Sequence, residues 1–243
     1  MNIIILTKKD QIEKNIYKIS DDRILHIKNI LKSKKYDIIE VGLLNGPTGK
    51  AEIIDIDKVH VKLKIVKINE TNSLEPRIDI ICALPRPQAL KKVLSTAATM
   101  GVQNLYLIRS EKVEKSYFHS RLLEKENYLK YLIEGLSQGK RTQLPSISVH
   151  KKFKHFIENN FPVEYNKPIK LLAHTTEDIY LNQLRVDKKQ HYVIAIGPEG
   201  GWNDFEILFM VKNGFQEFKL SKNILRVETA VTAALAQLEL INA

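Results

Sequence analysis

Residues 192–201 read Tyr-Val-Ile-Ala-Ile-Gly-Pro-Glu-Gly-Gly, an apolar run that ends in a glycine-rich turn. The run Tyr192–Ile196 has the length of a buried strand. After the turn, Asn203 stands three residues before Glu206, so the Asn side chain can cap a helix while the Glu side chain reaches back to it. Strand, turn and capped helix in this order are one unit of a fold in which the two kinds of element alternate.

The same alternation extends from Arg77 to the end of the chain. The predicted strands are Ile78–Ala83, Leu105–Ile108, Ile169–Ala173, Tyr192–Ile196 and Phe215–Leu220. The predicted helices are Gln88–Met100, Arg121–Gln138, Phe153–Glu158, Asp204–Asn213 and Val227–Leu240, and three of them are expected to end at Gly101, Gly139 and Gly214. This order predicts an α/β fold with a mostly parallel sheet covered by helices.

Residues 1–70 follow another pattern, with short runs rich in Ile and Val at Asp37–Val41, Lys50–Ile56 and Val59–Ile68. The turn-forming stretch Asn45–Gly49 separates the first two. We therefore predict a small β-rich domain over residues 1–72 and an α/β domain over residues 73–243, joined by a polar link at residues 70–76.

The last of these strands is expected to have an apolar and a basic face. Alternation places Val59, Val61, Leu63 and Ile65 on one face and Lys58, His60, Lys62 and Lys64 on the other. A basic strand face is typical of the solvated side of an antiparallel sheet and also of a nucleic-acid platform. Both interpretations stay open from the pattern alone.

Composition excludes several classes of protein. The chain has 243 residues, of which 44% are hydrophobic, so it can bury a core and is not expected to be disordered. Its one cysteine, Cys82, can form neither an internal disulfide nor a Cys-based zinc site. A chain without disulfides is typical of a protein in a reducing compartment. Asn2–Leu6 runs directly into charged residues, so we expect no signal peptide, no membrane span and a soluble, cytoplasmic protein.

The charge balance is basic. Lys and Arg number 38 and Asp and Glu 28, giving a net charge of +10. Such an excess is equally consistent with solubility and with an anionic partner, because clustered cations gain free energy when they displace counterions from phosphates.

Two segments of the α/β half are candidates for a site. Ligands of α/β sheets bind outside the carboxyl ends of the strands, which makes the turn Gly197–Gly201 one of them. The second is Leu220–Ala230, where Arg226 and Glu228 stand in an apolar stretch and are expected either to pair or to meet a ligand.

Neither segment carries a dinucleotide fingerprint, and Gly46–Lys50 lacks the residues of a phosphate loop. No metal-ligand spacing and no serine-hydrolase motif occur, so we predict no metal.

These two segments together resemble the paired C-terminal motifs of the 16S ribosomal RNA uridine N3-methyltransferase family, RsmE. Further similarities lie at Ala83–Arg86, at Met100-Gly101-Val102, at Ser137–Thr142 with Pro145, at His26-Ile27 with Ile30-Leu31, and at Asn45-Gly46. The chain departs from the family pattern at Ser221, where Gly is usual, and in the helix segment Thr96–Gly101.

The resemblance implies a SPOUT-type parallel sheet with a trefoil-knotted tail, a small N-terminal PUA-like β-barrel and a homodimer. It implies S-adenosylmethionine as cofactor and 16S rRNA, in the small ribosomal subunit, as partner, with methylation at N3 of a specific uridine. Three loops would then hold the cofactor. Their residues are Leu172, Ala173, His174, Ile196, Gly197, Gly200, Gly201, Leu220, Ser221, Ile224, Leu225, Thr229 and Ala230.

Methylation at N3 requires that the uracil base be unpaired, because N3 lies on its Watson–Crick edge. As N3 loses its proton, negative charge spreads onto O2 and O4, where a cation or an amide donor would stabilise it. We assign catalytic roles to Arg226, Arg141 and Glu199, with Arg226 ranked first, while the general base stays open between Glu199 and Glu228. Candidate RNA contacts are Arg86, Gln138, Lys62 and Lys64. Asn203 is a further amide donor. A non-catalytic RNA-binding protein on the same scaffold and a SPOUT enzyme for another rRNA or tRNA position remain as alternatives.

Overall fold

A computed structural model describes residues 2–69, 76–159, 168–175, 178–184 and 191–242. The chain divides into two compact units. The N-terminal unit comprises Met1–Ser73 together with Ile133–Leu144, and the C-terminal unit comprises Leu74–Leu132 and Pro145–Ala243. The boundary predicted between residues 72 and 73 lies outside the described residues. The assignment of Ile133–Leu144 to the first unit differs from the sequence-based division, which placed this segment in the second.

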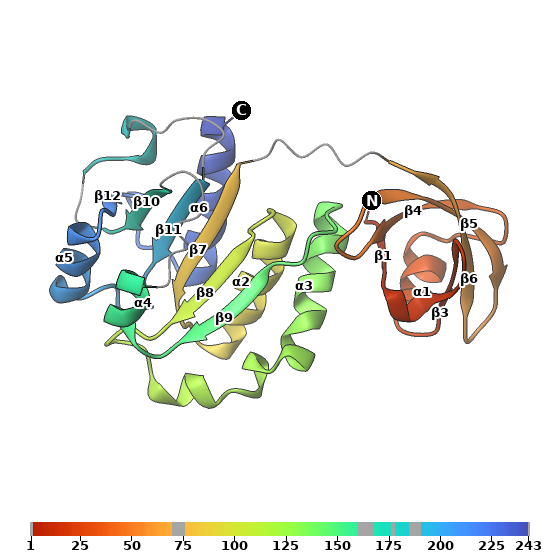
Figure 1. The fold of residues 1–243 in the computed structure, drawn as a ribbon, viewed down its shortest axis with the longest axis horizontal. Coiled ribbons are helices and arrows are strands. Elements are labelled where there is room, and N and C mark those ends of the chain that lie inside the picture. Colours follow the sequence, from red (N-terminus) through yellow and green to blue (C-terminus); the bar gives the residue numbers. More distant parts are fainter. Residues whose placement is uncertain (1, 70–75, 160–167, 176–177, 185–190, 243) are drawn as a thin grey trace. The chain divides into compact units, whose positions relative to one another are not determined.

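The C-terminal unit is built on a parallel sheet, as predicted (Figure 1). Its strand order is β12-β10-β11-β7-β8-β9, and every neighbouring pair runs parallel. The strands are β7 (Arg77–Ala83), β8 (Asn104–Ile108), β9 (Ser146–His150), β10 (Ile169–Ala173), β11 (His191–Ile196) and β12 (Gln216–Phe218). The sequence missed β9, because Ser-Ile-Ser-Val-His lies at the sheet edge and has no continuous apolar run.

Helices cover this sheet. They are α2 (Pro87–Thr99), α4 (Phe153–Asn159), α5 (Asp204–Lys212) and α6 (Val227–Asn242), with short 3-10 turns at Lys115–His119, Arg121–Leu123 and Leu181–Gln183. Helix α3 (Lys125–Gly139) begins in this unit and ends in the segment that belongs to the N-terminal unit. Helices α2 and α6 pack against one another, and α6 also contacts β11 (Figure 1). Because strands β7 and β11 lie at the centre of the sheet and are buried on both faces, their sequences are nearly continuous apolar runs.

All four predicted helix ends are found, and three of them follow the predicted chemistry. The Asn203 side chain accepts the Glu206 N–H at 2.8 Å, and Glu206 Oε2 accepts the Asn203 N–H at 3.0 Å, which confirms the capping box at α5. Gly101 and Gly214 have φ of 75° and 86° and end α2 and α5. Helix α3 also ends at Gly139, as predicted, but Gly139 is its last helical residue and the left-handed residue after it is Lys140, with φ of 53°.

The N-terminal unit contains a second six-stranded sheet, in the order β1-β4-β5-β6-β3-β2. The strands are β1 (Ile4–Leu6), β2 (Gln11–Glu13), β3 (Ile16–Ile19), β4 (Ile38–Leu43), β5 (Thr48–Ile56) and β6 (Val61–Ile68). The pair β1 and β4 is parallel and the rest are antiparallel. The sheet stays open between its edge strands β1 and β2 and is a half-barrel. Val59 precedes β6 and is 70% exposed, which corrects its predicted place on the buried face.

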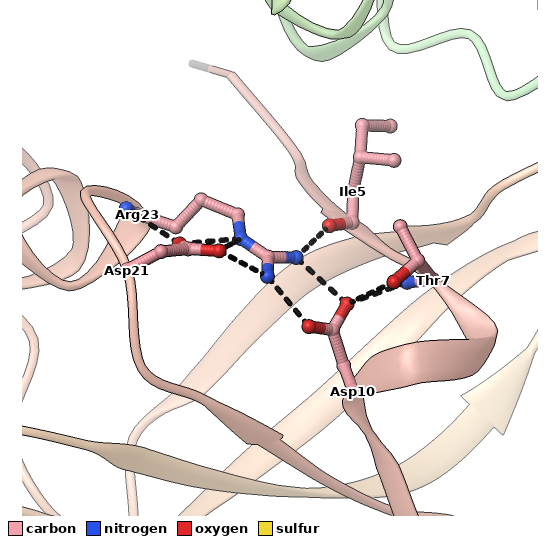
Figure 2. Close-up of polar contacts among 5 residues, drawn as sticks. All are labelled: Ile5, Thr7, Asp10, Asp21 and Arg23. Carbon is pink, nitrogen blue, oxygen red and sulfur yellow. Dashed lines mark hydrogen bonds and ion pairs between the residues drawn. The ribbon is translucent and has the colours of Figure 1, made fainter. Parts of the chain in front are cut away.

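A short helix, α1 (Arg23–Leu25), continues into a π-helical turn at His26–Ile30 and covers the core of this sheet. Arg23 ties it to the β1 region (Figure 2). Its guanidinium donates to the Ile5 carbonyl at 2.6 Å and forms ion pairs at 2.6 Å with both Asp10 and Asp21. Although burial by itself raises the pKa of Asp10, hydrogen bonds from Arg23 and Thr7 hold that pKa below its usual value.

The segment Ile133–Leu144 belongs to the N-terminal unit through backbone and side-chain contacts. The Ile3 N–H donates to the Ser137 carbonyl at 3.0 Å, and the Asn45 N–H donates to the Thr142 carbonyl at 2.8 Å. The Thr142 hydroxyl donates to the Gly46 carbonyl at 2.5 Å. The predicted turn at residues 45–49 thus serves as the attachment point for a segment almost a hundred residues further along the chain.

Candidate functional site

A pocket of about 250 Å³ lies at the carboxyl edge of the parallel sheet in the C-terminal unit. Three loops form it, and they follow the neighbouring strands β10, β11 and β12. This is the position at which α/β sheets bind ligands. The lining residues are Ala173, His174, Thr175, Ile196, Gly197, Pro198, Glu199, Gly200, Gly201, Trp202, Leu220, Ser221, Asn223, Ile224, Leu225, Val227 and Ala230.

The structure brings nearly all of the proposed cofactor residues around this pocket. The exceptions are Leu172, which is fully buried in β10, and Thr229, which is exposed on α6. Outside the three loops assigned to the cofactor, sequence reasoning missed Thr175, Trp202 and Val227. Trp202 follows the glycine turn directly, and its position beside that turn was a signal that could have found it.

The turn Gly197–Gly201 has a conformation that needs glycine. Gly201 has φ of 68°, and its N–H donates to the Pro198 carbonyl at 2.8 Å. A Cβ on Gly197 would lie 3.1 Å from Nε1 of Trp202, so a larger residue would push the indole away. Trp202 is 5% exposed, and its Nε1 has no hydrogen-bond partner within the described part of the chain.

A second loop, Arg109–Lys112 after β8, supports this turn. Lys112 Nζ donates to the Gly200 carbonyl at 2.9 Å. Beyond the turn, Glu206 is 3% exposed and accepts hydrogen bonds from the Ser110 hydroxyl at 3.1 Å and the Glu111 N–H at 2.8 Å. The same carboxylate caps α5, so one buried Glu joins the loop after β8 to the chain that leaves the glycine turn. The sequence pattern did not indicate this.

His174 closes the β10 side of the pocket. Its Nδ1 lies 3.1 Å from a Glu217 carboxylate oxygen, and its backbone N–H donates to the Phe218 carbonyl at 3.0 Å. Both side chains are mostly shielded from solvent. A carboxylate at Nδ1 favours the tautomer that carries the proton there, which orients the ring.

The charged residues proposed for catalysis have different surroundings. Glu199 is exposed at the pocket, and its carboxylate accepts the backbone N–H of Arg86 at 3.4 Å, where α2 begins. Glu228 pairs with Lys92 at 3.4 Å. Its pKa lies below the usual value because its own backbone N–H, Lys92 and Arg226 favour the carboxylate.

Arg226 itself is exposed, and its side chain has no hydrogen bond or ion pair within the described residues. The guanidinium stands in solvent one residue before α6, so its charge is not buried in the apolar stretch. Of the two residues expected to pair or to meet a ligand, Glu228 pairs and Arg226 stays a candidate ligand contact.

The remaining candidates lie in the N-terminal unit. Gln138 is exposed at the end of α3, and Arg141 is half-buried in the segment Ile133–Leu144. On the outer face of the half-barrel, Lys62 stands opposite Lys18 of β3 and Asp55 of β5, while Lys64 is exposed and stands opposite Glu52 of β5.

In the described ranges, no helix combines the length and the apolar character that crossing a bilayer requires.

Comparison with known proteins points to one family. A model described as an RNA methyltransferase domain matches residues 72–239. The chain is 30% identical to ribosomal RNA small subunit methyltransferase E 1 of Borreliella burgdorferi, over 96% of this chain and 95% of that protein. It is 29% identical to ribosomal RNA small subunit methyltransferase E of Treponema pallidum, over 97% and 90%.

The fold is shared with the crystal structure of ribosomal RNA small subunit methyltransferase E from Neisseria gonorrhoeae, which was determined bound to S-adenosyl methionine. The TM-score is 0.77 at 21% identity, with 99% of this chain and 98% of that chain covered.

Proposed function

The chain belongs to the family of ribosomal RNA small subunit methyltransferase E, and from this we propose that it transfers a methyl group from S-adenosylmethionine to N3 of a uridine in 16S rRNA. The observation that carries the proposal is the pocket made by the loops after β10, β11 and β12. Those loops contain the residues that we assign to the cofactor.

The residues of the pocket fit this cofactor. Ile196, Leu220 and Leu225 offer apolar walls for a purine ring, while the glycine turn lets backbone groups approach a ligand closely. Trp202 adds its indole ring to the lining of the same pocket. S-adenosylmethionine supplies an electrophilic methyl group when it is bound.

The side chains around the pocket would act on the uracil ring. N3 carries a proton that must leave, and Glu199 is the carboxylate that lines the pocket, so we assign it to accept that proton. The negative charge then spreads over O2 and O4, and we assign its stabilisation to Arg226, with Arg86 as a further cation. The uridine has to be unpaired for its Watson–Crick edge to reach these groups.

We further propose that the tail is threaded as a trefoil knot and that the N-terminal half-barrel is of PUA-like type. One observation supports the knot: β12 lies at the sheet edge, yet α6, which follows it, returns to pack on α2 and β11. The chain must therefore cross back over the carboxyl ends of the strands between residues 218 and 227.

We also propose that the enzyme acts as a homodimer on the small ribosomal subunit, in the cytoplasm. Ile224 supports the dimer, because it lines the pocket and is nevertheless 89% exposed. A second copy of the chain would cover this side chain and complete the pocket. The basic outer face of the half-barrel, with Lys62 and Lys64, would contact the rRNA.

Two measurements test the function. Calorimetry is expected to show that the purified protein binds S-adenosylmethionine, and absence of binding would favour a non-catalytic RNA-binding protein. Small subunits from a strain lacking this gene are then incubated with protein and labelled cofactor, and the product nucleoside is identified by mass spectrometry. We expect 3-methyluridine in 16S rRNA. Another product would assign the enzyme to a different position.

A further inference from the structure

A second pocket, of about 450 Å³, lies at the same edge of the parallel sheet, where β8 and β9 end. Arg109 follows β8 directly and Lys151 follows β9, and these strands are neighbours. Residues at the beginnings of helices α4 and α5 form its other wall, and the rings of Phe153 and Phe209 on these helices lie 6.0 Å apart. We call this second pocket the basic pocket.

The basic pocket concentrates positive charge. Arg109, Lys151, Lys152 and Lys154 line it, and all four are exposed. None of them forms an ion pair with a described residue. Of the two carboxylates that line it, Glu206 is buried and already accepts hydrogen bonds from Ser110 and Glu111. The other, Glu111, is exposed, so four cations share the pocket with one carboxylate that is not already hydrogen-bonded in the interior. The remaining excess of positive charge attracts an anionic ligand.

One of these cations is held in place by an aromatic ring. Lys154 Nζ lies 4.8 Å from the centre of the Phe205 ring, which is itself 49% exposed and stacks on Phe209. A cation over a ring face is attracted by the ring quadrupole, so the ammonium group is positioned at the pocket rather than extended into solvent. This arrangement distinguishes the basic pocket from a surface where lysines point independently into water.

The basic pocket adjoins the proposed cofactor pocket. Trp202 lines the cofactor pocket, and its ring lies 6.3 Å from that of Phe153, which lines the basic pocket. The next residue, Asn203, already lines the basic pocket. The supporting loop links them too, because Glu111 lines the basic pocket and Lys112 holds Gly200.

We propose that the basic pocket binds the phosphodiester backbone of the RNA next to the nucleotide that is methylated. The proposal rests on the proposed function, since it takes the occupant of the neighbouring site to be a uridine of rRNA. Phosphates bound here would fix the register of the strand, while the cofactor pocket selects the base.

The test compares three variants with equal numbers of substitutions. K151Q/K152Q/K154Q removes three charges from the basic pocket, and K151R/K152R/K154R keeps them. K125Q/K130Q/K212Q removes three exposed lysines elsewhere in the C-terminal unit. Each is checked for an unchanged melting temperature, and its affinity for fluorescein-labelled oligouridylate is measured by anisotropy over a series of KCl concentrations.

For the first variant, the slope of log affinity against log salt is expected to become shallower by about 2, since each phosphate contact on a single strand contributes roughly 0.7. At 0.1 M salt this corresponds to a loss of about a hundredfold in affinity. The arginine variant and the distant glutamine variant should keep the wild-type slope. Equal losses in both glutamine variants, or no change in either, would overturn the proposal.

Methylation of small subunits by the wild-type protein separates this proposal from the proposed function. If the wild-type protein produces 3-methyluridine and the salt slope of K151Q/K152Q/K154Q equals that of the wild type, the RNA-binding role of the basic pocket alone is refuted. A wild-type protein that binds the cofactor and does not methylate the subunit would refute the proposed function, whatever the slopes.

Discussion

The Lys112 ammonium group donates a hydrogen bond of 2.9 Å to the carbonyl oxygen of Gly200, across 88 residues of sequence. A Cβ on Gly200 would lie 3.1 Å from Cδ of the same lysine. The loop after β8 therefore restrains the glycine turn, and the Lys112 side chain would have to shift to accommodate a Cβ on Gly200.

Replacing Lys112 by Met should weaken S-adenosylmethionine binding, because the turn loses its restraint while the aliphatic stem is kept. One hydrogen bond of this kind contributes about 1 kcal/mol, so we expect roughly a fivefold rise in Kd. Calorimetry on K112M measures this. The matched control is K115M, a change of another exposed lysine in the same loop region. Equal affinities in the two variants would contradict the restraining role.

Gly201 and Gly214 form a second matched pair. Both have positive φ, at 68° and 86°, and a Cβ would meet nothing within 4 Å at either position. Each change to Ala should cost about 1 kcal/mol of unfolding free energy through backbone strain. Only G201A is expected to weaken cofactor binding, because Gly214 lies at the far end of α5. Denaturant unfolding and calorimetry give the two quantities, and a loss of cofactor affinity in G214A would disprove the distinction.

Arg226→Ala is expected to leave S-adenosylmethionine affinity nearly unchanged, since the guanidinium does not line the pocket. Its loss should lower the rate of methyl transfer by about 10² to 10³, the usual effect of removing one group that stabilises developing charge. Single-turnover methylation of small subunits measures the rate. Lys222→Ala, which removes an exposed cation from the same segment, is the control. Normal turnover by R226A would rule out the catalytic role.

The Asp10 carboxylate gives the N-terminal unit a defined response to acid. The pKa of Asp10 is lower in the folded protein than in the unfolded chain, where an Asp titrates at about 4. The ionised side chain therefore contributes its full stabilisation above about pH 4, and this stabilisation is lost as the pH falls through the pKa of the folded protein. Asp10→Asn should therefore destabilise the protein at neutral pH, and the gap to wild type should close in acid. Thermal melts from neutral to acid pH test this, and a gap that stays constant would exclude the ionised pair as its source.

The sequence predicted elements whose apolar pattern is strong and local. Tyr192–Ile196 and Ile78–Ala83 are buried on both faces, so a continuous apolar run suffices to identify them. Strands β1, β2 and β3 have only three or four residues each, which is too short for a periodic signal. Their pairing depends instead on partners such as β6, more than forty residues further along the chain.

The candidate site likewise has a part that the local sequence predicts and a part that depends on contacts between distant residues. The loops after β11 and β12 were predicted because glycine and charge mark them locally. The contacts that hold them, such as Ser110 with Glu206, join residues 96 positions apart and leave no local pattern. Glu206 was predicted only as part of a helix cap, and its second role needs the tertiary structure.

The inclusion of Ile133–Leu144 in the N-terminal unit has a consequence for how the chain is made. Synthesis proceeds from the N-terminus, so the half-barrel is translated long before the segment whose Ser137 and Thr142 backbone groups bond to Ile3 and Asn45. The N-terminal unit therefore cannot complete its hydrogen bonding until residue 144 has left the ribosome. A fragment that stops at residue 73 would lack these partners, and the shortest chain able to assemble the whole unit already contains β7, α2 and β8.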